Sequence, residues 1–215
     1  VGSGTNITGS SIANTLTGTS TASDSINPGL GADTVTGGGG VDYINITEVT
    51  SSTDIVVLGD STDANNYDQI TGFVSATDDI RALQSVHGWN STDGTTTVLL
   101  ATGATIKAAD LAGDSNIQTI SANISTNTYI TYLAGTSTYT QLEAACITAV
   151  GLTGAMDAAA VALVAVDDGT HTGLWQFTSG DTVDNAATAA ELELIGILKD
   201  VNDATALVVG DFLFT

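Results

Sequence analysis

A nine-residue unit that occurs twice in tandem constrains this chain more than any other feature of its sequence. Residues 28–36 read PGLGADTVT and residues 37–45 read GGGGVDYIN, without a gap between them. Both fit the pattern [GP]-G-x-G-x-D-x-U-x, in which the apolar residue U is Val35 or Ile44. Repetition of one short unit at a fixed period indicates a repeat architecture rather than an ordinary globular core.

This unit resembles a known calcium-binding nonapeptide repeat, and its residue types suit a metal-binding turn followed by a short strand. Glycine is needed where a turn demands positive φ and a close approach of the backbone. Turn carbonyls and an aspartate carboxylate are hard oxygen ligands, which suit Ca²⁺. Each strand then buries one apolar side chain, so a coil of about eighteen residues buries only two, too little to offset its ordering entropy. We therefore expect folding of this segment to depend on calcium.

The predicted metal-binding residues come from the two strong copies and from one weaker copy before them. Residues 19–27 keep Asp24 and Ile26 in phase but lack the glycines, and Asn14 starts a still weaker copy. Glycine–aspartate turns also occur in β-proteins that bind nothing, but in-phase repetition argues against that alternative. The predicted metal site comprises Asp24, Gly29, Gly31, Asp33, Gly38, Gly40 and Asp42.

The unit resembles the nonapeptide repeat of RTX proteins, which form calcium-binding parallel β-rolls and are exported by type I systems. The resemblance implies that turns two repeats apart stack on the same side of the roll and share an ion. Asp24 and Asp42 would then face one row, and Asp33 would face the other row with Asn14. One to three calcium sites are expected.

Residues 53–83 resemble the segment that closes such rolls, where D-x-I-x-x-F is followed by D-x-I-x-L. Here the two pieces read DQITGF from residue 68 and DDIRAL from residue 78. Alternation places four apolar side chains inside, where they would cap the open end of the coil: Ile70, Phe73, Ile80 and Leu83. Further acids of this segment either hold another ion or form solvated surface: Asp54, Asp60, Asp63, Asp68, Asp78 and Asp79.

The remaining chain predicts a β-rich second part. Residues 95–103 and 127–135 alternate as strands do, and residues 141–149 favour a short helix. Residues 158–181 read as a hairpin with a DDGT turn. The ending DFLFT resembles the C-termini of proteins exported by type I systems.

We therefore expect an all-β protein in two domains. Residues 1–83 would form a calcium-binding parallel β-roll with its capping segment. Residues 84–215 would form a β-sandwich-like assembly or export domain with one or two short helices. The chain begins at Val1 without a methionine or a signal peptide, as expected of a processed precursor or a fragment.

Charge excludes most partners. Twenty-four acidic residues against three basic ones give a net charge of −21, so neither nucleic acid nor an anionic membrane surface is an expected partner. The sequence offers no apolar run of the roughly 20 residues that a transmembrane helix needs. Its one cysteine, Cys146, excludes an internal disulfide and lies in an apolar stretch that predicts burial.

No catalytic constellation is recognisable, and we expect no enzyme. His87 and His171 lack both an H-E-x-x-H zinc motif and a G-x-S-x-G nucleophile, so both are expected to be exposed or structural. Trp89, Trp175 and Tyr129 are aromatic residues that could contact a ligand, although core positions are the more common outcome.

The sequence favours an extracellular, calcium-dependent structural protein that self-assembles on the cell surface, as S-layer proteins and RTX-type matrix or adhesin fibres do. Its expected partners are calcium and copies of itself, in a sheet or filament. One alternative is the non-catalytic C-terminal export and folding module of a secreted protease or lipase. The other is a calcium-dependent, ligand-binding adhesin. Its variant, ice binding, is not favoured, because T-x-T pairs such as Thr17/Thr19 form no long flat array.

Overall fold

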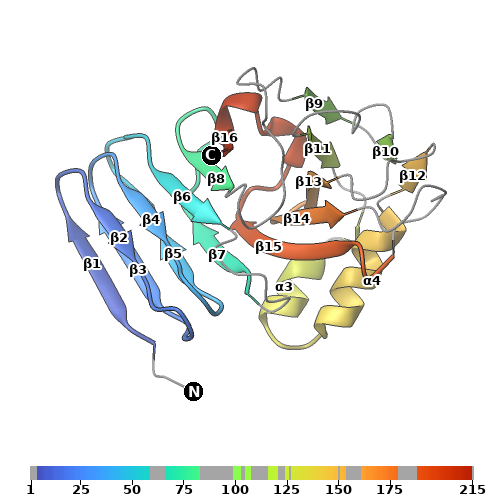
Figure 1. Cartoon of the computed structure of the whole chain (residues 1–215), viewed down its shortest axis with the longest axis horizontal. Coiled ribbons are helices and arrows are strands. Elements are labelled where there is room, and N and C mark those ends of the chain that lie inside the picture. The colour runs from blue at the N-terminus through green and yellow to red at the C-terminus, as the bar shows by residue number, and fades with distance from the viewer. Residues whose placement is uncertain are drawn as a thin grey trace.

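The structure of this chain is a computed structural model, and it is mostly β with parallel sheets (Figure 1). Two α-helices occur in the part of the chain that it describes. The predicted fold class, an all-β protein built on a parallel β-roll, is confirmed. The described residues are 4–58, 66–82, 99–102, 105–107, 116–120, 124–125, 127–149, 151–153, 161–178 and 188–214.

The roll consists of two parallel sheets whose strands alternate along the chain (Figure 1). The strands of the first sheet are β1 (Asn6–Ser10), β3 (Ser25–Gly29), β5 (Tyr43–Asn45) and β7 (Asp68–Thr71). The strands of the second sheet are β2 (Thr15–Thr17), β4 (Thr34–Thr36), β6 (Ile55–Leu58) and β8 (Asp79–Ala82). Each coil therefore gives one strand to each sheet, with a turn at either side.

One apolar ladder from each sheet fills the interior of the roll. In the first sheet Ile26 pairs with Ile44 and Ile44 with Ile70, and all three are at most 1% exposed. In the second sheet Val35 pairs with Val56, which pairs with Ile80. Each buried side chain contributes roughly 1.5–3 kcal/mol. The expected inward positions Ile70, Phe73 and Ile80 are confirmed, and Leu83 lies outside the described residues.

Strands from the C-terminal part close the end of the roll. Residues 66–82 form a further coil, and its two strand edges are both covered. β15 (Leu192–Lys199) pairs in parallel with β7, and β16 (Phe212–Phe214) pairs in parallel with β8. Strands from the C-terminal part thus extend both sheets of the roll. The division into domains 1–83 and 84–215 stays a prediction.

Beyond β15 the first sheet continues into the second half of the chain. The added strands are β14 (Thr172–Thr178), β13 (Val161–Asp167), β11 (Asn116–Ile120) and β9 (Leu99–Thr102). The predicted hairpin is confirmed, because β13 and β14 pair antiparallel. A separate two-stranded sheet contains β10 (Thr105–Lys107) and β12 (Gly151–Thr153).

Both faces of the sheet are buried at β13, β14 and β15. Leu163 and Ala165 of β13 face the core that the roll shares, whereas Val164 and Val166 face a second core. The second core contains helices α3 (Thr128–Leu133) and α4 (Tyr139–Ala149), which lie beside β15 (Figure 1). The helix predicted at 141–149 and the burial of Cys146 are both confirmed.

The strand predicted at 127–135 is wrong, because these residues form α3. Alternation of Tyr, Ile and Thr suits a strand, yet Tyr129, Tyr132 and Leu133 also share one helix face at spacings of three and four. The structure buries that face against the second core, with Tyr129 fully buried and Ile130 39% exposed. Tertiary packing therefore overrides the local β propensity.

The packing of β16 generates a test of how the roll is closed. Phe212 is 4% exposed within the shared core, so Phe212→Ala should lower the free energy of unfolding by about 3 kcal/mol or more. Val208→Ala, a change at a 41% exposed side chain nearby, should cost at most about 0.5 kcal/mol. Urea unfolding at fixed calcium measures both, and equal effects would contradict the closure by β16.

Candidate metal centre

The aspartates at the turns of the roll are arranged in two columns. The first column contains Asp24 and Asp42, which precede strands of the first sheet, and Asp68, the first residue of β7. The backbone N–H of Asp24 donates to Asp42 Oδ1 at 2.6 Å, and that of Asp42 donates to Asp68 Oδ1 at 3.2 Å. Each carboxylate thereby joins its own coil to the preceding coil.

The second column lies at the opposite turns and contains Asp33, Asp54 and Asp78, with Asn14 at its start. The N–H of Asn14 donates to Asp33 Oδ1 at 2.6 Å, and the N–H of Asp33 donates to Asp54 Oδ1 at 2.9 Å. The N–H of Asp54 donates to Asp78 Oδ1 at 3.1 Å. All six aspartates of the two columns are at most 4% exposed. Asp24 and Asp42 therefore lie in one row and Asp33 in the other with Asn14.

The glycines of the two strong repeats adopt the backbone conformation that the pattern requires. Gly29, Gly31, Gly38 and Gly40 have φ of 100°, 104°, 94° and 114°. At Gly38 an added Cβ would lie 2.0 Å from the carbonyl oxygen of Thr19 in the turn below. Glycine thus lets successive turns stack in contact, which brings turn carbonyls close to the carboxylates.

The carboxylates differ in how the protein satisfies them. Asp24 accepts hydrogen bonds on both oxygens, from the N–H of Thr5 and from the N–H and hydroxyl of Thr19. Burial raises the pKa of Asp24, but these bonds outweigh it, so the pKa lies below its ordinary value. Asp24 is therefore stabilised as an anion by the chain itself.

Asp33 and Asp54 each accept one backbone hydrogen bond, which lowers the pKa but does not outweigh burial. Burial, together with the charges of Glu48, Asp78 and Asp33, raises the pKa of Asp54 from 3.8 to about 6. Burial and Glu48 also raise the pKa of Asp33. The Oδ2 atoms of Asp33 and Asp54 are buried without a hydrogen-bond partner. Buried, unsatisfied carboxylate oxygens are costly unless a cation binds them, so these atoms fit a hard metal ion.

One acidic residue near the second column was missed by the sequence analysis. Glu48 lies in the turn between β5 and β6, and its carboxylate is within 4.8 Å of those of Asp33 and Asp54. Glu48 follows the second repeat outside the nonapeptide pattern, so only its proximity in space identifies it. Asp54, Asp68 and Asp78 had been noted only as further acids, and Asp60 and Asp63 lie outside the described residues.

The histidine and aromatic candidates occupy structural positions where they are described. His171 is 6% exposed, and its Nδ1 accepts a hydrogen bond from the N–H of Asp200 at 2.9 Å. Trp175 is fully buried, and its Nε1 donates to the hydroxyl of Tyr129 at 3.0 Å. His87 and Trp89 lie outside the described residues.

Comparison with known proteins gives one structural likeness to report. No protein-family model and no curated protein matches the chain. The structure is similar to the solution structure of the AlgE6R3 subunit from the Azotobacter vinelandii mannuronan C5-epimerase, with a TM-score of 0.45 and 17% sequence identity. The match covers 99% of this chain and 80% of the other. Among the described residues, no helix has the length and apolar character needed to cross a bilayer.

The close stacking at Gly38 can be tested with a matched pair of glycine substitutions. Gly38→Ala adds both backbone strain and a clash with Thr19, and should destabilise the protein by about 2 kcal/mol or more. Gly135 also has positive φ, of 69°, but an added Cβ meets nothing within 4 Å. Gly135→Ala should therefore cost only about 1 kcal/mol. Thermal unfolding in calcium compares them, and equal losses would contradict the stacking.

The raised pKa of Asp54 predicts how stability depends on pH when a chelator removes divalent cations. Between pH 4 and pH 6 the native state holds a proton on Asp54 that the unfolded chain has released. The stability that the protonated Asp54 contributes to the native state is therefore fully present below pH 4 and is lost as the pH rises through about 6.

In the wild type, deprotonation of Asp54 should lower the free energy of unfolding by about 1 to 3 kcal/mol between pH 4 and pH 7. In Asp54→Asn this decrease should be absent. Chelator-treated wild type and variant are compared by chemical unfolding across this range. A difference between them that does not change with pH would contradict the raised pKa of Asp54.

Proposed function

We propose that this chain is an extracellular, calcium-ordered β-roll protein that assembles with copies of itself into a surface layer, filament or matrix. The observation that carries the proposal is the pair of buried aspartate columns, in which Asp33 and Asp54 each keep an oxygen without a hydrogen-bond partner. Calcium held between stacked turns supplies the missing interaction and joins adjacent coils.

Asp33, Asp42 and Asp24 would hold the ions from the two columns, with carbonyls from the turns that contain the predicted glycines. In the first column, a Cβ on Gly37 would lie 2.4 Å from Asp42 Oδ2 and 2.7 Å from Asp68 Oδ2. These two carboxylates thus converge on one glycine. Such convergence of oxygens is what an ion shared by two turns requires.

The calcium levels on the two sides of a cell membrane suit a protein that folds after export. At millimolar calcium and extracellular-type affinities of 10⁻⁴ to 10⁻³ M, each site contributes roughly 0.4–1.4 kcal/mol. Several coupled sites then order the roll outside the cell. At the low calcium of the cytosol, the acidic turns repel and the roll stays open.

Assembly is supported by the exposed end of the roll. In the described part of the chain, β1 and β2 are the outermost strands of their sheets, and a strand edge of this kind can pair with a further strand. Large apolar side chains are also exposed on the roll, including Ile12 at 69% and Val49 at 93%. Calcium reduces the repulsion between copies that each carry a charge of −21.

A calcium titration tests this proposal. Circular dichroism should show that the chain gains β-structure at millimolar calcium, and negative-stain microscopy should show sheets or filaments that a chelator dissolves. Folding with calcium but without assembly would contradict the assembly function and favour an export and folding module. Absence of any response to calcium would contradict the metal site itself.

Asp42→Asn tests the first column without changing the size of the side chain. The variant should reduce the calcium-dependent increase in melting temperature by roughly 1 to 5 °C, the effect of losing one site of the strength estimated above. Glu143→Gln on α4 removes the same charge away from the roll and is the control. An unchanged calcium response in Asp42→Asn would contradict Asp42 as a ligand.

A further inference from the structure

The turn between β5 and β6 departs from the glycine turns around it. Residues 46–53 read ITEVTSST, which is longer than the glycine turn at 28–32 and contains no glycine. The side chain of Glu48 joins it to the turn below. Glu48 Oε1 accepts from the N–H of Gly31 at 2.7 Å, and Oε2 accepts from the N–H of Ser52 at 2.8 Å.

A hydrogen bond to the glycine amide does not by itself require a charged residue. On the opposite side of the roll, the N–H of Gly40 donates to Asn66 Oδ1, and this neutral side chain takes the equivalent place in the first column. Glu48 instead adds a negative charge beside two carboxylates that are each 1% exposed. That charge is unfavourable unless something positive lies between the three groups.

The chain supplies no such positive group in the part that the structure describes. No lysine, arginine or histidine there forms an ion pair with Asp33, Glu48 or Asp54. The Oδ2 atoms of Asp33 and Asp54 also have no hydrogen-bond partner. Two carboxylates that each have a buried, unpartnered oxygen therefore lie beside a third, with one oxygen of each residue within 4.8 Å of the others.

We propose that Asp33, Glu48 and Asp54 together hold one of the calcium ions of the second column, and that Glu48 replaces the glycine carbonyls of the regular turns there. This inference rests on the proposed calcium-ordered roll and assigns to it a ligand outside the nonapeptide. Three carboxylates suit Ca²⁺, which accepts six to eight oxygens in flexible geometry, better than Mg²⁺, which demands a near-ideal octahedron.

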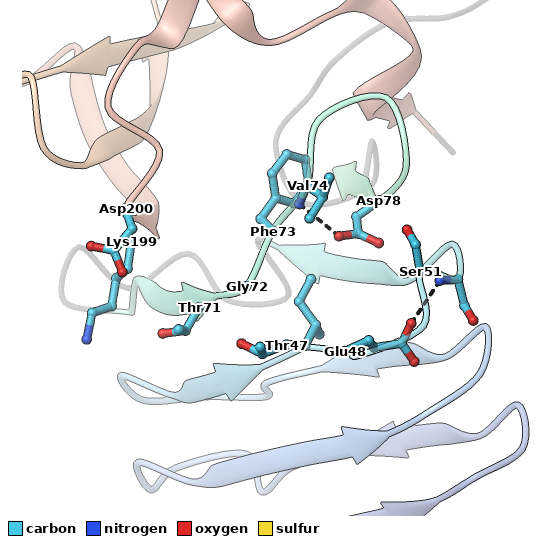
Figure 2. A pocket seen from close by; sticks show the side chains of 12 residues that line it. Thr47, Glu48, Ser51, Thr71, Gly72, Phe73, Val74, Asp78, Lys199 and Asp200 are labelled. Atoms are coloured by element: carbon cyan, nitrogen blue, oxygen red, sulfur yellow. Dashed lines mark hydrogen bonds between the residues drawn. The ribbon is translucent and has the colours of Figure 1, made fainter.

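One of the three carboxylates borders an open pocket. This pocket of about 380 Å³ is lined by Glu48, Ser51, Ser52 and Asp78 among other residues, whereas Asp33 and Asp54 do not line it. Figure 2 shows the carboxylates of Glu48 and Asp78 at this pocket, with the hydrogen bond that holds each of them. The pocket leaves room for water beside Glu48, and Ca²⁺ accepts water among its oxygen ligands.

Affinity should be highest at this site, because calcium affinity rises with the number of carboxylate ligands. An ion there joins the turn at 28–33 to the turn at 46–53, the place where the glycine pattern ends. The site therefore orders the irregular turn of the roll and should fill before the glycine turns.

Isothermal titration of the full chain with Ca²⁺ tests the site, with Glu48→Gln and Asp54→Asn as variants. Asp54→Asn replaces one carboxylate oxygen by an amide while the other can still accept from Asp33. Each variant should lose the tightest binding phase, or weaken it by at least tenfold, and keep the weaker phases. The double variant should lose no more than either single one, because both residues hold the same ion.

Glu143→Gln is the charge-matched control and should bind calcium like the wild type. Titration with Mg²⁺ should give no phase that depends on Glu48. If the wild type binds calcium and Glu48→Gln binds it identically, this site is wrong while the proposed function stands. If the wild type binds no calcium, both are wrong. Circular dichroism at saturating calcium verifies that the variants fold.

Discussion

The structure depends on carboxylates buried at the corners of the roll. The backbone N–H groups of Asp24 and Asp42 in one column, and of Asp33 and Asp54 in the other, each donate to the aspartate carboxylate of the next coil, so hydrogen bonds run along both columns. A carboxylate has about four acceptor positions, and one amide uses only one of them. The same groups that hold the coils together therefore also leave buried acceptor capacity, which a cation can use. Asp24 meets this demand with bonds from Thr5 and Thr19, but Asp33 and Asp54 do not.

The rest of the molecule is connected to this arrangement through its sheets. The first sheet continues from β7 into β15 and the hairpin of β14 and β13, and the second sheet ends with β16 on β8. Order in the roll is thus linked to order in the C-terminal part by hydrogen-bonded strands and a shared apolar core. A ligand that orders the coils therefore stabilises the C-terminal part of the chain as well as the turns that bind the ligand.

The negative charge of the chain opposes formation of the roll unless a cation offsets it. A chain with a net charge of −21 and three basic residues resists compaction, and its column carboxylates are desolvated as the roll forms. Under the proposed function, calcium reverses that balance where it is abundant. The proposed site at Glu48 would add a carboxylate ligand at the turn in which the repeat is least regular, and so a further connection between the coils there.

The nine-residue repeat by itself determined the roll. Its period predicts strands with one inward side chain and positive φ at Gly29, Gly31, Gly38 and Gly40, because each property is local to one unit and repeats with it. The opposite rows of Asp33 and Asp42 were implied by the resemblance to RTX repeats. The hairpin and the helix at 141–149 could also be predicted from the sequence, since each is formed by one contiguous segment.

Only the tertiary structure decided the features that depend on partners distant in sequence. Residues 127–135 alternate like a strand but form α3, because the second core buries Tyr129 on a helix face. The pairing of β16 with β8 joins segments more than 100 residues apart, which no local pattern encodes. Glu48 belongs to no motif, and its relation to Asp33 and Asp54 exists only because a longer turn folds it over the turn below.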